Sequence, residues 1–242
     1  FVPEWPVWIV IDSIQALSTA PRTMAAFWWT TDIRERGADW FDTHIAGIGA
    51  WQNKRNAALL LVMPEIPGQR RILNAYPFRR CFQQEQAIVS SWVGEHRAGR
   101  FVNFVTALLP HDLAGVAHKG LSVEVVPTEP VGKGLAVRLG LGTQQRLICT
   151  LNDLTCGYVQ EDIRPRYTFA QGRTAYGTVV SDAAFVYVRN AGGRQDAGFI
   201  NGTRLEIGDD VLFQQPTHDM FQENRTALPG IAARFRWQSG AK

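Results

Sequence analysis

Short apolar runs separated by turn residues organise the first half of the chain. Each run has the length of a β-strand and is rich in Val, Ile, Phe, Trp and Thr, which favour strands. Helical periodicity is nearly absent. The runs occupy residues 7–11, 24–30, 57–63, 87–93, 101–109 and 121–126. The pattern predicts an all-β protein, a large antiparallel β-sandwich with few or no helices.

The second half of the chain carries hairpin signals. Residues 135–139 and 147–151 flank a turn at 142–144. Asn201-Gly202 is a strong hairpin turn because both residue types tolerate positive φ. Turn signals about every 8 to 12 residues are typical of an antiparallel sandwich or barrel. Further strands are expected at 174–180, 184–189, 196–200, 203–207, 211–214 and 232–237.

Three stretches lack a strand pattern and are predicted to be long loops, which often carry binding residues. They are residues 32–39, 111–120 and 216–230. No shift in composition marks a domain boundary, and large β-sandwiches of this length form one domain. We therefore expect a single β-sandwich domain over residues 1–242. Phe1 replaces an initiator methionine and no signal peptide follows, so we expect this domain to be the C-terminal part of a longer protein.

Composition and charge narrow the classes of binding partner that we expect. The formal charge is +3 and no run of Lys or Arg stands out, which argues against a nucleic-acid partner. The apolar runs are far shorter than the roughly 20 residues of a membrane span, so no membrane partner is expected. A mildly basic surface suits an acidic polymer. Cys81, Cys149 and Cys156 form no metal-binding motif, and we interpret them as buried free thiols.

Histidine and carboxylate residues give the first candidate chemistry. His111, Asp112 and His118 lie close together in sequence and are of the types that bind zinc. Their spacing matches no known motif, so solvated loop residues are the preferred interpretation. The other histidines, His44, His96 and His218, have no such neighbours. Asp12 closes an apolar strand, where a carboxylate caps a turn or, with residues of a neighbouring strand, binds a metal.

Acid pairs and tyrosines give the second candidate chemistry. Glu161 and Asp162 are adjacent, so on a strand they point to opposite faces and cannot flank one glycosidic bond. Tyrosine can serve as an acid or base toward a sugar, and Tyr187, in an alternating strand, is expected only to pack. The other tyrosines are Tyr76, Tyr158, Tyr167 and Tyr176. No GxSxG, P-loop or HExxH motif occurs, and we assign no catalytic, cofactor-binding or metal-binding residue.

Tryptophans crowd the first 51 residues, where six of the eight lie: Trp5, Trp8, Trp28, Trp29, Trp40 and Trp51. Aromatic side chains dominate protein cores and also stack on sugar rings. Trp28 and Trp29 are consecutive, so on a strand one faces the core and the other faces away. The outward ring needs a contact that shields it from water. The sequence leaves three alternatives for this contact: a neighbouring domain, a sugar, or loops of this domain.

The order of these segments resembles the β-sandwich domain of heparinase II/III-like and related alginate-lyase-like polysaccharide lyases. The segments are VWIVIDSI, AAFWWTT, ALLLVMPE, RFVNFVTALLPHD and AAFVYVRNAGGRQDAGFINGTRLEIGDD. The most specific pieces are Phe104, Thr106, Leu108, Leu109 and Pro110, and the hairpin with Asn201-Gly202-Thr203. The similarity spans most of the chain and rests on strand patterns.

The resemblance implies several further features. An N-terminal helical toroid, as a domain or a separate chain, supplies most catalytic residues in that family, and nothing in this sequence resembles it. The sandwich can hold a structural zinc, and Asp12 matches the strand-end aspartate of that site. Thr30 stands where a histidine is expected, which leaves the ligand set incomplete, so the cofactor remains unknown. The family also implies a bacterial periplasmic or secreted location.

These observations favour one function and leave others open. The resemblance implies a non-catalytic or substrate-lining domain of a polysaccharide lyase. Such an enzyme acts by β-elimination on uronic-acid-containing polysaccharide, where a base removes the C5 proton and the carboxylate is neutralised. The partners are then the toroid and an acidic polysaccharide. The alternatives are a freestanding carbohydrate-binding or adhesion module and a purely structural β-sandwich.

Overall fold

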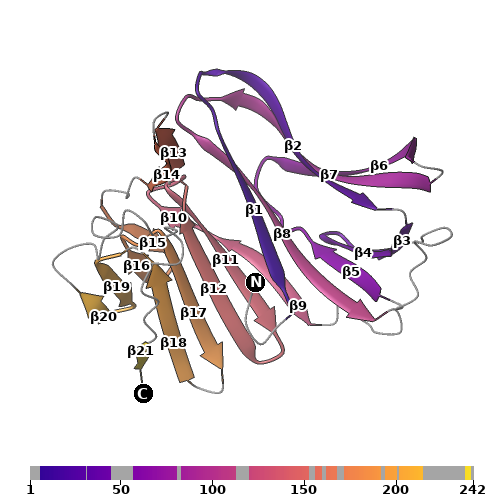
Figure 1. Cartoon of the computed structure of the whole chain (residues 1–242). Coiled ribbons are helices and arrows are strands. Elements are labelled where there is room, and N and C mark those ends of the chain that lie inside the picture. Colours follow the sequence, from indigo (N-terminus) through magenta and orange to yellow (C-terminus); the bar gives the residue numbers. More distant parts are fainter. Residues whose placement is uncertain are drawn as a thin grey trace. The chain divides into compact units, whose positions relative to one another are not determined.

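The protein is built from antiparallel β-sheets, as the sequence pattern predicts (Figure 1). The computed structural model describes residues 6–30, 32–44, 57–80, 83–112, 120–152, 156–159, 162–167, 172–191, 194–200, 202–214 and 238–240. Within these ranges all of the regular secondary structure is β-strand. The predicted all-β sandwich class is therefore confirmed.

The chain divides into two compact units, Phe1–Val123 and Glu124–Lys242. The expectation of a single domain over residues 1–242 stays a prediction.

The first unit is a sandwich of two sheets. Figure 1 shows β2, β7 and β6 side by side in one layer, with β1 and β8 among the strands of the other. The larger sheet has the order β1 (Trp8–Gln15), β8 (Phe101–Asp112), β5 (Ala57–Val62), β4 (Trp40–His44) and β3 (Asp32–Arg36). The smaller has the order β2 (Ala20–Thr30), β7 (Gln83–His96) and β6 (Gln69–Arg80).

Side chains from both sheets meet in the core of this unit. Phe41 and Leu61 of the larger sheet pack with Ile88 of the smaller sheet, and Trp28 packs against them. Trp28 Nε1 also donates a hydrogen bond to Thr106 Oγ1 at 2.9 Å, which joins the sheets through side chains. The contacts fix which face of each strand is buried, because successive side chains on a strand alternate between faces.

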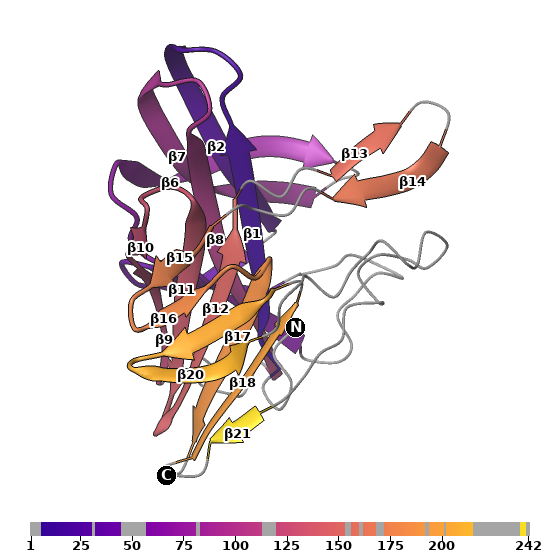
Figure 2. The ribbon, with the colours of Figure 1, turned by 90° about the vertical axis from the view of Figure 1, so that its left-hand side faces the viewer.

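The second unit is also a sandwich. Figure 2 shows β12, β17 and β18 running side by side. Their sheet has the order β21 (Gln238–Gly240), β18 (Arg194–Ile200), β17 (Phe185–Ala191), β12 (Gln144–Leu151), β11 (Gly134–Leu141) and β9 (Leu121–Val126). The other sheet has the order β10 (Thr128–Glu129), β15 (Thr174–Tyr176), β16 (Val179–Ser181), β19 (Arg204–Ile207) and β20 (Asp210–Gln214). β13 (Cys156–Val159) pairs with β14 (Asp162–Tyr167).

The core of the second unit brings the two sheets together. Val186 and Phe199 of the larger sheet pack with Tyr176, Leu205 and Phe213 of the smaller sheet. The rings of Phe199 and Phe213 lie 4.6 Å apart between centroids, a distance typical of aromatic pairs in cores.

Three predictions need correction. The hairpin expected at Asn201-Gly202 is wrong, because β18 and β19 on its two sides belong to different sheets. Residues 32–39 were expected to be a loop, but β3 occupies Asp32–Arg36 and pairs with β4. The pairing supplies backbone hydrogen bonds to a charged segment whose side chains do not indicate a strand. Residues 174–180 were expected to be one strand, but Gly177, at φ 65°, turns the chain between β15 and β16. The expected strand at 232–237 and the loop at 216–230 lie outside the described residues.

Asp12 does not end a strand. It lies in the middle of β1, is exposed, and pairs with Phe104 of β8. Thr30 is the last residue of β2, which belongs to the other sheet. Asp12 and Thr30 are therefore not on neighbouring strands of one sheet, as a ligand pair of the expected kind would be. The apolar run of the sequence ends at Asp12, but the strand continues to Gln15 because its backbone pairs with β8 as far as that residue.

Candidate functional site

The outward face of the β2-β7-β6 sheet carries exposed aromatic side chains. Trp28 points into the core, so Trp29 and Phe27 share the opposite face, and each is 54% exposed. The predicted division of Trp28 and Trp29 between core and surface is thus confirmed. Two residues on one strand face lie about 7 Å apart, so the two rings form one strip. We call this surface, made of Phe27, Trp29, Arg70 and Val93, the aromatic face.

Strand register places a cation on the aromatic face. Ser91 of β7 pairs with Ala25 on one side and with Arg70 on the other, and its hydroxyl donates to the Arg70 carbonyl at 3.4 Å. Paired residues of antiparallel strands project from the same face. The exposed Arg70 therefore lies on the same sheet face as Phe27 and Trp29. Along the strand direction, its row of paired residues is next to the row that contains Phe27.

The composition of the aromatic face suits a sugar polymer. Flat aromatic rings present an apolar surface with a polarised π system, against which the C–H face of a sugar ring can stack. A guanidinium binds carboxylates through two parallel hydrogen bonds. The face therefore offers stacking and one anion-binding group, the two contacts that a uronic acid residue needs.

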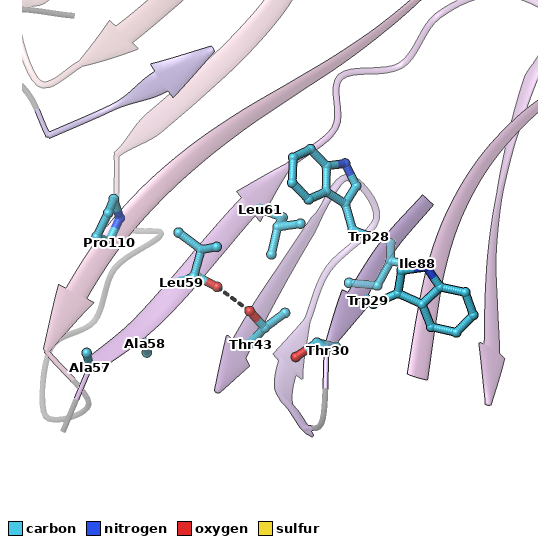
Figure 3. Close-up of a pocket in the computed structure, with 10 residues that line it drawn as sticks. All are labelled: Trp28, Trp29, Thr30, Thr43, Ala57, Ala58, Leu59, Leu61, Ile88 and Pro110. Carbon is cyan, nitrogen blue, oxygen red and sulfur yellow. Dashed lines mark hydrogen bonds between the residues drawn. The ribbon is translucent and has the colours of Figure 1, made fainter. Parts of the chain in front are cut away.

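A cavity opens next to Trp28 and Trp29 at the end of β2 (Figure 3). Its volume is about 430 Å³. Figure 3 shows the two indole rings directed to different sides of their strand, with Leu59, Leu61 and Thr43 opposite Trp28. We call this cavity the Trp28 pocket. Its lining residues are Trp28, Trp29, Thr30, Thr43, Ala57, Ala58, Leu59, Leu61, Ile88 and Pro110.

The polar groups around the Trp28 pocket are engaged with other protein atoms. Thr43 Oγ1 donates to the Leu59 carbonyl at 2.8 Å, and Thr30 Oγ1 donates to the Asp32 carbonyl at 3.1 Å. Trp28 Nε1 is bound to Thr106. None of the described residues that line the pocket is charged. The described part of the walls is therefore mostly apolar.

A second cluster, on the larger sheet, joins three strands. His111 Nε2 on β8 lies 2.8 Å from Asp42 Oδ1 on β4, and Arg34 Nη1 on β3 lies 3.4 Å from Asp42 Oδ2. The side chains of His111 and Asp42 are only 9% and 8% exposed. The expectation that His111 is a solvated loop residue is wrong, because β8 extends to Asp112 and carries His111 into this ion-pair network.

Both ring nitrogens of His111 face acceptors. Nδ1 lies 2.8 Å from the Asp112 carbonyl and Nε2 faces the Asp42 carboxylate. A carbonyl and a carboxylate only accept hydrogen bonds, so each ring nitrogen that carries a proton has an acceptor within reach. His118, the third member of the set expected from the sequence, lies outside the described residues, and in the described ranges no group of three metal-binding side chains occurs.

The structure places several other candidates in the core. Tyr187 and Tyr176 are buried in the second unit, and that Tyr187 only packs stays a prediction. Cys149 is a buried free thiol, as predicted, and burial raises its pKa above the ordinary thiol range. His96 is buried against Trp92, with ring centroids 5.3 Å apart. His44 lies on β4.

Some candidates carry no described side chain. Tyr76, Tyr158, Tyr167, Asp162 and Cys156 lie on described strands without described side chains, whereas His218, Glu161, Cys81, Trp5 and Trp51 lie outside the described residues. Trp40 lies on β4 beside Phe41, and because neighbours on a strand alternate, it faces away from the core that Phe41 enters. Trp40 therefore does not extend the aromatic face.

Sequence reasoning missed Asp42, Arg34 and Phe27. Asp42 stands between aromatic and β-branched neighbours in WFDTH, and a carboxylate inside such a strand is the signal that could have indicated a buried ion pair. Phe27 is two residues from Trp29, a spacing that places both rings on one strand face.

No family model, no curated protein and no solved structure matches this chain. In the described part of the chain, no helix has the length and apolar character that crossing a membrane requires.

Proposed function

We propose that this chain is a non-catalytic, substrate-lining β-sandwich of a polysaccharide lyase that acts by β-elimination on uronic-acid-containing polysaccharide. The observation that carries the proposal is the aromatic face, where Trp29 and Phe27 stand exposed on the same sheet face as Arg70. In this proposal the polymer lies along the strip, and the protein is periplasmic or secreted in a bacterium.

Charge supports the choice of an acidic polymer. The formal charge of +3 favours approach of a polyanion. Arg70 pairs with a uronate carboxylate, while the rings of Trp29 and Phe27 stack on the neighbouring sugars. Neutral sugars would use the rings but gain nothing from Arg70, so polymers that carry carboxylates bind more tightly.

The chemistry of elimination supports a lining role. A base must remove the C5 proton while the carboxylate is neutralised. Arg70 suits the second task, but the aromatic face contains no base. His111 lies on the other sheet, and both of its ring nitrogens already have acceptors. The base therefore belongs to the proposed partner, an N-terminal helical toroid that acts with this chain.

Equilibrium binding to alginate, heparin and heparan sulfate, with neutral dextran as comparison, tests the proposal. Trp29→Ala is expected to weaken binding to the acidic polymer at least about tenfold, because a stacked aromatic anchor is lost. The matched control is Trp8→Ala, since Trp8 lies in the same unit and is 51% exposed. Arg70→Gln is expected to weaken binding and to reduce its dependence on salt.

Three outcomes would count against the proposal. Equal losses in Trp29→Ala and Trp8→Ala would remove the aromatic face from the interaction. Equally tight binding of dextran would favour the freestanding carbohydrate-binding module. Formation of unsaturated product by this chain alone, measured by ultraviolet absorbance, would contradict the non-catalytic role.

A further inference from the structure

The Trp28 pocket has the properties of a site for hydrocarbon. We propose that it binds the aliphatic chain of an uncharged amphiphile, with the head group left in solvent. This inference does not rest on the proposed function, because its argument uses the apolar space next to Trp28, although Trp29 of the aromatic face also lines the cavity.

The lining chemistry selects against polar occupants. Three donors of lining residues, Trp28 Nε1, Thr43 Oγ1 and Thr30 Oγ1, already bind protein acceptors. A sugar or a charged group placed here would lose its hydrogen bonds to water without replacing them, which costs free energy. A hydrocarbon chain loses no hydrogen bonds and gains contacts with Leu59 and Leu61.

The volume indicates the size of the occupant. A cavity of about 150 Å³ with aliphatic and aromatic walls holds benzene. The Trp28 pocket, at about 430 Å³, is nearly three times larger and lies in the range of small-molecule sites. A chain of several methylene groups fits this space.

Exposure of the lining residues indicates where the chain enters. Ala57, the first residue of β5, is exposed, whereas Leu61 and Ile88 are buried in the core. Figure 3 shows Ala57 at the end of the lining away from Ile88 and Trp29. The occupant therefore directs its chain from Ala57 toward Leu61, and its head group lies near Ala57.

Titration calorimetry with hexyl, heptyl and octyl glucoside, each below its micelle-forming concentration, tests the proposal on the full chain. Burying one more CH₂ contributes about 0.8 kcal/mol, so each added carbon is expected to raise the association constant about fourfold. Glucose alone is expected not to bind at this site, and octanol is expected to compete with octyl glucoside.

Ala57→Phe fills the entrance and is expected to abolish octyl glucoside binding. Ala98→Phe is the matched control, because Ala98 is an exposed residue and does not line the pocket. Affinity that does not depend on chain length, glucose binding as tight as octyl glucoside, or unchanged binding by Ala57→Phe would each overturn the proposal. If Ala57→Phe does not fold, the chain-length series with the native sequence decides the matter.

These outcomes are separable from those of the proposed function. Ala57→Phe leaves Trp29 and Arg70 in place, so polymer binding is expected to persist in this variant. Loss of the chain-length dependence with intact polymer binding would overturn only the hydrocarbon site.

Discussion

Trp28 Nε1 donates a 2.9 Å hydrogen bond to the Thr106 hydroxyl and thereby links the two sheets of the first unit. Thr106 is buried, so its oxygen depends on a protein partner. The indole also packs against the buried cluster of Phe41, Leu61, Met63 and Ile88. One side chain therefore contributes both packing and a satisfied polar group to this core.

Trp28→Phe is expected to destabilise the first unit by about 2–4 kcal/mol, because the ring becomes smaller and the Thr106 hydroxyl loses its donor. Urea unfolding measures the change. Trp29→Phe is the control, and a shift within about 0.5 kcal/mol is expected for this exposed position. Equal effects of the two substitutions would show that the link through Thr106 contributes little.

The buried ion pair gives a second prediction. Asp42→Asn is expected to cost about 1–3 kcal/mol, because the buried His111 ring and the partly exposed Arg34 lose the carboxylate that they contact. A double-mutant cycle with His111→Gln measures the coupling energy, which we expect to reach at least about 1 kcal/mol.

The exposed pair Arg138 and Glu124, whose charged atoms lie 2.9 Å apart, is the comparison for that cycle. Glu124→Gln is expected to change stability by less than about 1 kcal/mol, since exposed ion pairs are screened by water and salt. Similar losses in Asp42→Asn and Glu124→Gln would contradict the role assigned to burial.

Substitution of His96 is expected to stabilise the protein. Both of its ring nitrogens are buried and lack a hydrogen-bond partner among the described residues, which is unfavourable for stability. His96→Phe keeps the aromatic contact with Trp92 and removes both nitrogens. Thermal unfolding is expected to show a gain of about 1 kcal/mol, and a loss of stability would refute this view of the site.

Burial of the Cys149 thiol makes a prediction about reactivity. Burial raises its pKa, so the thiol stays protonated in the folded protein at a pH where the unfolded chain forms thiolate. Its contribution to stability is therefore present below the ordinary thiol pKa and is lost as pH rises above it. Peptide mapping after iodoacetamide treatment is expected to find Cys149 unmodified until denaturant is added. Rapid alkylation of the folded protein would contradict its burial.

Strands were predictable where local pattern decides. β9 and the β11–β12 hairpin follow the apolar alternation and turn residues of their own segments. β6 was not predicted, since QRRILNAYPFRR is interrupted by arginines and a proline, and pairing with β7 determines its structure. β3 was missed for the same reason, because its strand character depends on pairing with β4.

The candidate sites divide in the same way. The opposite directions of Trp28 and Trp29 follow from strand alternation and were predictable. Asp42 and His111 are 69 residues apart and lie on strands separated by β5, so their contact depends on strand order. The row that joins Ser91 to Arg70 likewise depends on register, which local sequence does not determine.

The most direct test of the central claim is hydroxyl-radical footprinting of the chain with and without a uronic-acid polymer. Trp29 and Trp8 are exposed to similar extents, 54% and 51%, so they serve as internal references for each other. We expect the polymer to protect Trp29 and Phe27 from oxidation and to leave Trp8 unchanged. Equal oxidation of Trp29 with and without bound polymer would contradict the assignment of the aromatic face as the substrate-lining surface.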